Sequence, residues 1–188
     1  MRQHTYIGIA GWHVWENGGA FYPKDVEGTK LTQYAAVLPS VEINLTFYRP
    51  FREATIVKWT EEVPDGFLLA VKGQKTVTHT KRLRGTRPEM EQFLAMIAPF
   101  GNKLGPIVFQ LPPSLKPDYR RLRNFLRLLP KDGRFAIEFR NPLWHVEHTY
   151  AMLRAANVAV CMSDLNGSSS PHFAPAPFAS ARHPATRT

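Results

Sequence analysis

Short apolar runs alternate with amphipathic stretches along most of this chain, and this alternation constrains the fold more than any other feature. Each run has the length of a β-strand and is rich in Val, Ile and Phe. The runs are residues 7–12, 41–48, 67–72, 106–111, 134–140 and 158–164. Between them, apolar residues recur at helical spacing in the stretches 31–38, 56–63, 93–98, 122–129 and 150–156. This repeat predicts an α/β fold, a parallel sheet with helical crossovers.

The spacing of the repeat and the lack of a nucleotide motif narrow the choice of α/β fold. A spacing of roughly 25 to 35 residues fits βα units. No Gly-rich phosphate-binding loop opens the first predicted helix, which disfavours a dinucleotide-binding fold. A closed (β/α)8 barrel typically needs about 250 residues, and this chain has 188. The pattern alone leaves a barrel and an open doubly wound sheet as alternatives.

Composition and charge limit the class of protein. No apolar run approaches the roughly 18 to 20 residues of a membrane helix, and the first residues have no apolar segment of a secretory signal. Cys161 is the only cysteine, which suits a reducing compartment. We therefore expect a cytoplasmic protein that does not bind a membrane. The formal net charge is +9, and the basic clusters at 72–87 and 120–134 could attract phosphates or nucleic acid, or form a solvated surface.

The segment 166–188 has a different composition from the rest of the chain. It consists almost entirely of Ala, Pro, Ser, Thr, His and Arg, with Phe173 and Phe178, and has no strand or helix period. This composition is typical of a disordered Pro-rich tail. It is also what a GC-rich coding region gives when it is read out of frame. We therefore predict a domain over residues 1–165 and a disordered or out-of-frame tail over 166–188.

Several motifs occur in the order in which a known family has them. They are Gly8–Trp12, Phe21–Pro23, Val41–Arg49, Ala70–Lys72 with Thr78–Leu83, Gly105–Pro113, and Ile137–Arg140 with Trp144. Over residues 7 to about 164 the chain thereby resembles the YecE-like family (domain of unknown function 72). The resemblance implies a TIM-type barrel and no particular activity, because the family has none assigned. The segment 166–188 does not match the family's seventh and eighth strands, so we expect an incomplete, truncated or frameshifted TIM-type (β/α) barrel of about six βα units.

In such barrels the reactive groups come from the C-terminal ends of the strands, and side chains alternate between the interior and the helix layer. This parity directs one set of polar residues inward: Glu42, Asn44, Lys72, Gln110, Glu138, Arg140 and Asp164. Because a buried charge costs several kcal/mol unless it is paired, we expect the acids of this set to be matched by its cations. A self-satisfied polar layer is one interpretation. So many polar strand ends of one parity exceed what stability requires, which favours a binding or catalytic site.

Three constellations could give this site its chemistry. Glu42 and Glu138 could serve as general acid and base, with Lys72 holding one of them ionised. A divalent metal could bind the three acids with His79, although the sequence has no metal-ligand spacing and requires no cofactor. A phosphate or sulfate group could bind at the rim, to Lys72, His79, Lys81, Arg82 and Arg140.

Aromatic residues gather near the same strand ends. They are Trp12, Tyr22, Phe47, Tyr48 and Trp144. They could stack on a sugar ring or a base. Alternatively, Phe47 and Trp144 are core anchors beneath the loops.

The preferred hypothesis is an enzyme-like barrel that binds a small polar or anionic substrate and performs acid–base or hydrolytic chemistry. Glu42, Lys72 and Glu138 are its predicted catalytic residues, and no metal ligand is assigned. The predicted substrate-binding residues are Trp12, Asn44, Tyr48, His79, Gln110, Arg140, Trp144 and Asp164. One alternative is a nucleic-acid-binding protein that uses the basic run 72–87, and another is a truncated product without function. The sequence predicts no oligomeric state.

Overall fold

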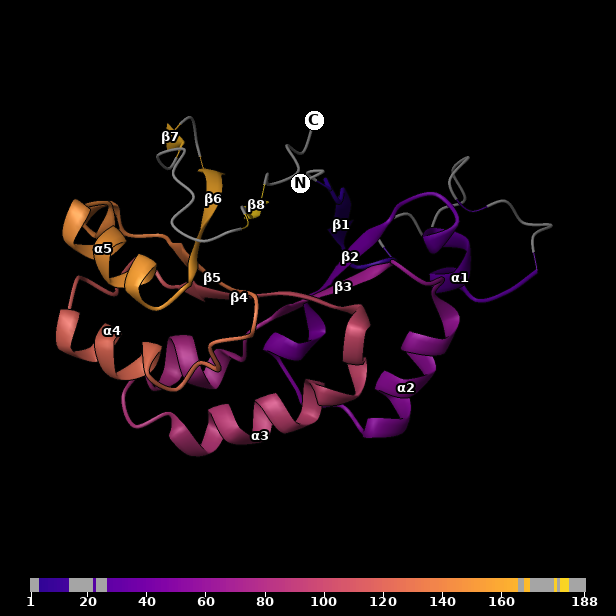
Figure 1. Ribbon diagram of the computed structural model, residues 1–188, viewed down its shortest axis with the longest axis horizontal. Helices are drawn as coiled ribbons and strands as arrows, with labels where there is room; N and C mark the ends of the chain where they lie inside the picture. Colours follow the sequence, from indigo (N-terminus) through magenta and orange to yellow (C-terminus); the bar gives the residue numbers. More distant parts are fainter. Residues whose placement is uncertain are drawn as a thin grey trace. The chain divides into compact units, whose positions relative to one another are not determined.

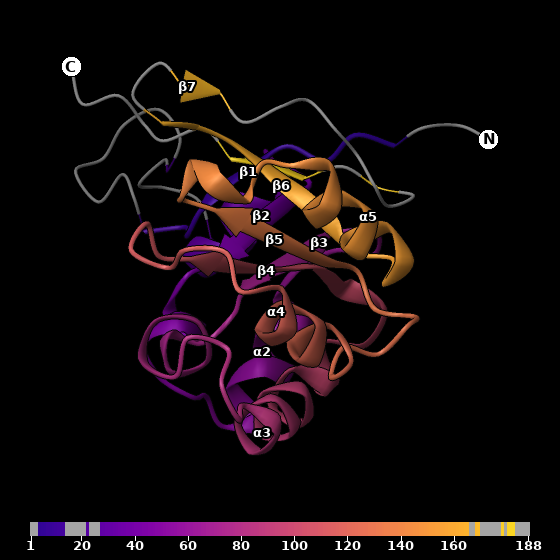
Figure 2. The same ribbon diagram turned by 90° about the vertical axis from the view of Figure 1, so that its left-hand side faces the viewer.

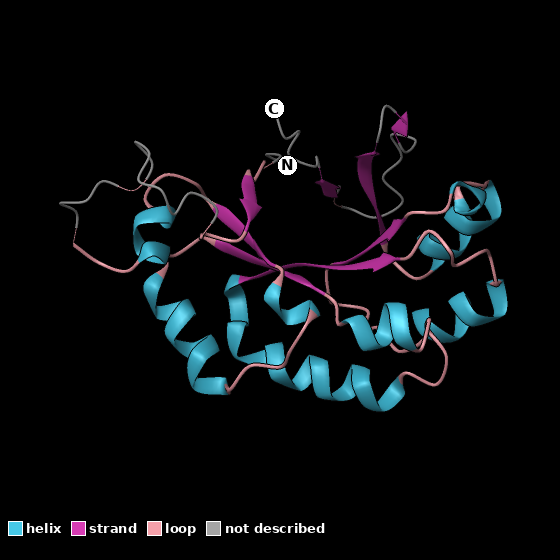
Figure 3. Ribbon diagram, turned by 180° about the vertical axis from the view of Figure 1, so that it is seen from behind, coloured by secondary structure: helices cyan, strands magenta, loops and turns pink. Residues whose placement is uncertain are grey.

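The computed structural model describes residues 4–13, 22, 27–165, 168–169, 178 and 180–182. Over these residues strands and helices alternate along the chain, which confirms the predicted α/β pattern (Figure 3). The chain forms two compact units. Unit 1 comprises residues 1–72 and 93–105, and unit 2 comprises residues 73–92 and 106–188.

Unit 1 contains three parallel strands. They are β1 (Gly8–Ala10), β2 (Ser40–Ile43) and β3 (Leu68–Lys72). In the register, Ile9 pairs with Val41, and Glu42 with Ala70. The helices are α1 (Lys30–Ala35), α2 (Glu53–Glu62) and two 3-10 helices, η1 (Leu45–Phe47) and η3 (Ala98–Lys103). Helix α1 contacts α2, and both lie beside β2 and β3 in Figure 1.

The core of unit 1 follows from the alternation of side chains along its strands. Val41 and Ile43 of β2 and Leu69 and Val71 of β3 are buried, and the residues between them, Glu42, Ala70 and Lys72, are half-buried. The helices contribute Leu31, Tyr34 and Ile56 to the same core. The polar residues Glu42 and Lys72 therefore lie on the half-buried face of the strands, as the sequence predicts.

Unit 2 contains the second set of parallel strands, β4 (Leu104–Leu111, in this unit from Pro106 on), β5 (Phe135–Phe139) and β6 (Ala159–Leu165). In the register, Gln110 pairs with Glu138, and Ala136 with Ala159. Its helices are α4 (Tyr119–Leu126), α5 (Glu147–Ala155), the π-helical turn η2 (Thr76–Thr80) and the 3-10 helix η4 (Pro142–Trp144). Helix α3 (Arg87–Ile97) begins in unit 2 and ends in unit 1.

The two faces of the unit 2 strands pack against different parts of the chain. On one face, the Phe109 ring contacts Phe125 of α4 edge-on at 5.1 Å. On the other face, Val108, Ala136, Ala159 and Cys161 form a buried cluster, and Phe178 packs against it. In Figure 2 the strands β4, β5 and β6 lie side by side with α4 below them.

Two further strands lie in the segment for which the sequence predicts no regular element. Strand β7 (Ser168–Ser169) pairs antiparallel with β6, and β8 (Ser180–Arg182) pairs parallel with it. A strand with an unpaired edge accepts any backbone that can hydrogen-bond to it. Such pairing needs no apolar period, so the pattern of the sequence does not reveal it.

The second predicted strand is shorter than its apolar run suggests. It was expected over 41–48, but β2 ends at Ile43 and residues 45–47 form η1. The Thr46 hydroxyl lies within hydrogen-bond distance of the Ile43 and Lys72 carbonyls, at 2.8 and 2.7 Å. These bonds favour a turn over further strand. Asn44, predicted on the inward face of this strand, therefore lies outside it, and Leu45 is exposed.

The other predicted elements are confirmed with small shifts at their ends. Helix α4 begins after Asp118, whose carboxylate accepts a hydrogen bond from the Arg121 backbone N–H at 2.9 Å and caps the first turn.

Among the described residues, no helix has the length and apolar character needed to cross a membrane.

Candidate functional site

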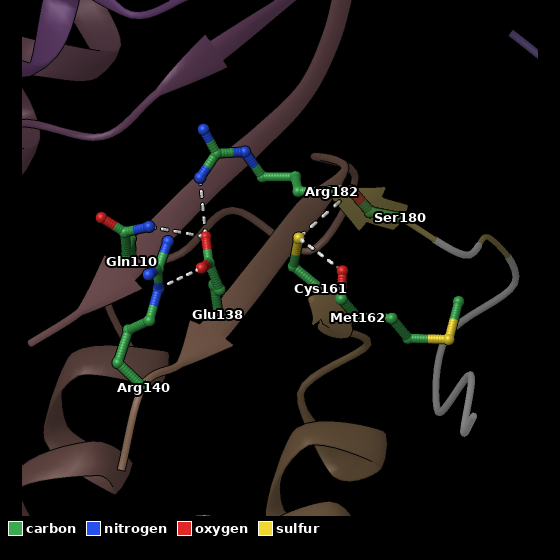
Figure 4. A network of polar contacts seen from close by, with 7 residues as sticks. All are labelled: Gln110, Glu138, Arg140, Cys161, Met162, Ser180 and Arg182. Atoms are coloured by element: carbon green, nitrogen blue, oxygen red, sulfur yellow. Dashed lines mark hydrogen bonds and ion pairs between the residues drawn. The ribbon is translucent and has the colours of Figure 1, made fainter. Parts of the chain in front are cut away.

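A fully buried carboxylate, that of Glu138, is the centre of the polar network in unit 2 (Figure 4). Its Oε2 atom accepts hydrogen bonds from Gln110 Nε2 at 2.8 Å and from Arg182 Nη1 at 2.7 Å. Its Oε1 atom accepts a hydrogen bond from Arg140 Nε. The two guanidinium groups remain partly exposed, so the network reaches from the core to the surface.

Strand register explains how three of these residues meet. Gln110 and Glu138 are direct partners in the pairing of β4 with β5, and Arg140 follows Glu138 by two residues on the same face. The sequence analysis predicted that these three residues share a face, and this prediction is confirmed.

Sequence reasoning missed the fourth member, Arg182. It lies in β8, where Ser180 aligns with Cys161 and Arg182 with Ser163. The Ser180 hydroxyl donates to Cys161 Sγ at 3.7 Å, next to the Glu138 network (Figure 4). The one feature of the sequence that pointed toward such a partner was Glu138 itself, a carboxylate that needs a cation when it is buried.

The described side chains of the network include more cationic than anionic groups. It combines one carboxylate with two guanidinium groups, and each guanidinium carries five N–H donors, more than one carboxylate can use. Both oxygens of Glu138 already accept hydrogen bonds. This arrangement suits an anchor for the two arginines better than a group that exchanges protons with a substrate.

Unit 1 holds two of the predicted catalytic residues, Glu42 and Lys72. Both are half-buried and share one face, since Glu42 pairs with Ala70 and Lys72 is two residues beyond. The Lys72 ammonium lies 4.7 Å from the centre of the Phe47 ring, a cation–π distance. Asn44 has a buried Oδ1 atom, with no hydrogen-bond partner among the described residues.

The predicted catalytic trio takes Glu42 and Lys72 from unit 1 and Glu138 from unit 2. A joint role for the three residues therefore stays a prediction.

The predicted aromatic residues have different environments. Trp144 is buried, donates from Nε1 to the Leu115 carbonyl at 2.8 Å and stacks on Phe139, which supports its interpretation as a core anchor. Trp12 is also buried, and the Tyr22 hydroxyl donates to its carbonyl at 2.5 Å. Burial raises the pKa of Tyr22. Tyr48 is the opposite case, with 72% of its surface exposed.

His79 and Asp164 were predicted as ligand-binding or metal-binding residues. His79 lies in η2, with Nδ1 2.8 Å from the Thr78 hydroxyl. In β6 the register aligns the odd-numbered residues with the face that carries Glu138, because Ala136 pairs with Ala159. The side chain of Asp164 lies outside the described residues. The described part of the chain contains no group of three His, Cys, Asp or Glu side chains that could hold a metal.

The basic run 72–87, the basis of the nucleic-acid alternative, is partly paired with acids. Lys81 forms an ion pair with Glu89 at 2.6 Å, and Arg87 lies 3.7 Å from Glu91. The Lys81 hydrogen bond lowers the pKa of Glu89. Pairing of this kind reduces the charge available for phosphates, and nucleic-acid binding stays a prediction.

His145, which the sequence analysis did not single out, follows η4. Its Nδ1 atom lies 3.0 Å from the Tyr150 hydroxyl. Burial lowers the pKa of His145, and a hydrogen bond with the Phe139 backbone partly opposes this shift. Burial also raises the pKa of Tyr150.

Comparisons with a family model and with known proteins identify the same protein family. The family model described as "Protein of unknown function DUF72" matches residues 6–188, a range that includes the segment 166–188. UPF0759 protein YunF of Bacillus subtilis is 28% identical over 162 residues, which are 80% of this chain. The chain spans only 57% of the length of that relative.

Solved structures of DUF72 family proteins share the fold. One from Thermotoga maritima is 26% identical with a TM-score of 0.77, and covers 95% of this chain and 73% of its own. One from Enterococcus faecalis is 18% identical with a TM-score of 0.73, and covers 96% of this chain and 74% of its own.

Proposed function

The chain belongs to the DUF72 family of proteins of unknown function, and from this premise we propose that it is a TIM-type barrel protein that binds a small anionic ligand where its strands end. The parallel strands with helical crossovers in both units support the barrel. In barrels of this type, binding groups come from the C-terminal ends of the strands. Gln110, Glu138 and Arg140 occupy that position in unit 2.

The observation that carries the proposal is the pairing of two arginines with the buried Glu138 carboxylate. A buried carboxylate costs several kcal/mol unless it is paired, and one arginine would be enough to balance its charge. Among the described side chains of the network, the guanidinium groups therefore outnumber the carboxylate, and both are partly exposed. Guanidinium groups bind carboxylate and phosphate groups through paired hydrogen bonds. Glu138 then acts as a positioning residue that fixes both arginines.

The chemistry that we propose is acid–base or hydrolytic, with Glu42 and Lys72 as the proton-transfer pair. Their half-buried positions on one face of β2 and β3 support this role. Asn44 of the same unit is proposed to accept a hydrogen bond from a donor group of a ligand bound in unit 1, since its buried Oδ1 has no hydrogen-bond partner among the described residues. Substitutions Glu42→Gln and Lys72→Met should abolish any turnover and leave anion binding in place.

Anion binding is tested by titration calorimetry with inorganic phosphate and with malonate at constant ionic strength. Arg182→Gln should weaken the binding of at least one probe about tenfold or more, because a hydrogen bond to a charged group contributes about 1.5–3 kcal/mol. Arg154→Gln is the matched control, since Arg154 pairs with the exposed Glu147 on α5. It should bind both probes as the wild type does.

Loss of Arg140 removes part of the charge that balances Glu138 and could unfold the protein. The double variant Glu138→Gln, Arg140→Gln removes one negative and one positive charge together, so the net charge of the network does not change, and its fold can be checked by circular dichroism. We expect it to be folded and unable to bind the probes. Two results would rule out the proposed site. One is that the wild-type protein binds neither probe. The other is that the wild type, Arg182→Gln and the double variant bind the probes with equal affinity.

A further inference from the structure

Unit 1 contains an open recess of about 920 Å³ that the proposed function does not use. It is lined by residues that follow β1, by the loop between β2 and α2, and by α2 itself. Its size lies within the range of about 300–1,000 Å³ that is usual for small-molecule sites. The residues of its wall therefore indicate which class of molecule it would take.

Three aromatic rings form one part of the wall. The Trp59 ring lies edge-on to Trp12 at 5.3 Å between ring centres and to Phe51 at 4.9 Å. Trp12 is buried, while Trp59 and Phe51 are half-buried. Edge-to-face pairs of this kind hold rings in fixed orientations, so a ligand would meet a rigid aromatic surface.

Cationic side chains line the same recess. The described lining residues include four cations, Lys30, Arg49, Arg52 and Lys58, and one acid, Glu62. The Arg49 guanidinium lies 5.3 Å from the centre of the Phe51 ring. Glu62 is engaged by the Thr29 hydroxyl at 3.0 Å and lies 3.8 Å from Lys58. Among the described lining residues, cations therefore outnumber acids.

The loop that carries the cations is fixed at two points. The Phe51 backbone N–H donates to Met96 Sδ at 3.2 Å. The Arg52 carbonyl accepts the first backbone hydrogen bond of α2, from Thr55, at 3.0 Å. A site that is already ordered loses less conformational entropy when it binds a ligand.

We propose that this recess binds an aromatic anion, a small molecule that joins a planar ring to a phosphate or another acidic group. The ring stacks on Trp59, which Trp12 and Phe51 contact edge-on, and the acidic group contacts Arg49 and Arg52. A neutral sugar would use the aromatic surface but not the cations, and inorganic phosphate would use the cations but not the rings. The proposal rests on residues of unit 1 alone and is independent of the anion site at Glu138.

The test uses adenosine 5′-monophosphate as the probe, with adenosine and inorganic phosphate as its two halves. Titrations are performed in the Arg182→Gln background, in which the Glu138 site should bind anions about tenfold more weakly. We expect the nucleotide to bind at least tenfold more tightly than either half. Trp59→Leu should reduce its affinity to that of phosphate, and the double variant Arg49→Gln, Arg52→Gln should reduce it to that of adenosine.

The control is Arg87→Gln, which removes an exposed cation of α3 that lies outside the recess. It should bind the nucleotide as its parent does, and thermal denaturation shows whether each variant is folded. Should Trp59→Leu unfold, the more conservative Trp59→Phe replaces it, with a smaller loss expected. Three results would each overturn the proposal. The nucleotide could bind no more tightly than phosphate, or glucose could bind more tightly than the nucleotide. The third is an equal loss of nucleotide affinity in Arg87→Gln and in the double variant.

Discussion

At the scale of single residues, Glu138 shows how a buried strand position orders the polar side chains around it. Its burial requires compensation, and its neighbours supply two guanidinium groups and an amide. The carboxylate thereby fixes side chains that would otherwise move freely at the surface. For the proposed function, we expect the affinity for an anion to depend on this fixed geometry as well as on net charge.

His145 should make the stability of the fold depend on pH. Burial lowers its pKa in the folded state below the ordinary value of 6.5, so the unfolded chain binds the proton more tightly. The contribution to stability is complete above the unfolded pKa, and it is lost as the pH falls through the folded pKa. Urea unfolding between pH 7.5 and pH 5 should show this loss, and His145→Gln should reduce it.

The matched control for this prediction is His148→Gln, an exposed histidine on α5 close to His145 in sequence. It should keep the pH dependence of the wild type. Equal pH dependence in the wild type and in His145→Gln would show that His145 is not responsible.

Residues on strands were predictable from the sequence where one parity is polar. Gln110 and Glu138 stand out because apolar residues flank each of them in the chain, and Arg140 shares the parity of Glu138. In β6 the odd-numbered and the even-numbered positions both include apolar residues, so the pattern could not fix which set of side chains lies on the face of Glu138. Arg182 could not be predicted at all, because its place depends on pairing with the edge of β6.

At the scale of elements, α1 joins the first two strands through one hydroxyl. The buried Tyr34 hydroxyl accepts a hydrogen bond from the Ile9 backbone N–H at 2.9 Å and donates to the Ser40 carbonyl at 2.8 Å. Tyr34→Phe keeps the ring but leaves both backbone groups without this partner. The cost should be about 1–3 kcal/mol, measured as a lower free energy of unfolding in urea.

The effect of losing the Tyr34 hydroxyl should also be confined to the strands that it joins. Hydrogen exchange should become faster in β1 and β2 of Tyr34→Phe and stay unchanged in α4 and α5. Tyr48→Phe, at an exposed tyrosine, serves as the control and should change neither measurement. A stability of Tyr34→Phe equal to that of the wild type would show that water replaces the lost hydroxyl.

Element types were more predictable than element ends. Six strands and five helices follow from periods in the sequence, since each must bury one face. The end of β2 was not predictable from its apolar run, because the Thr46 side chain reaches a carbonyl of β3 that is distant in sequence. The strands β7 and β8 depend in the same way on a contact that the local pattern does not contain.

At the scale of the whole molecule, positive charge is in excess, with a formal net charge of +9. Like charges repel each other in a compact state, and salt screens this repulsion. Added sodium chloride should therefore raise the melting temperature by a few degrees, since about 1 kcal/mol corresponds to roughly 2–4 °C in a chain of this size.

Sulfate should raise the melting temperature more than chloride does at the same ionic strength, if the arginines form specific anion sites. A ligand that binds only the folded state stabilises it in proportion to the logarithm of its concentration. Millimolar sulfate keeps the general salting effect small. The difference between sulfate and chloride should shrink in Arg182→Gln and persist in Arg154→Gln. Equal melting curves in the two salts would mean that the positive charge acts only as a diffuse field, without a site that selects its anion.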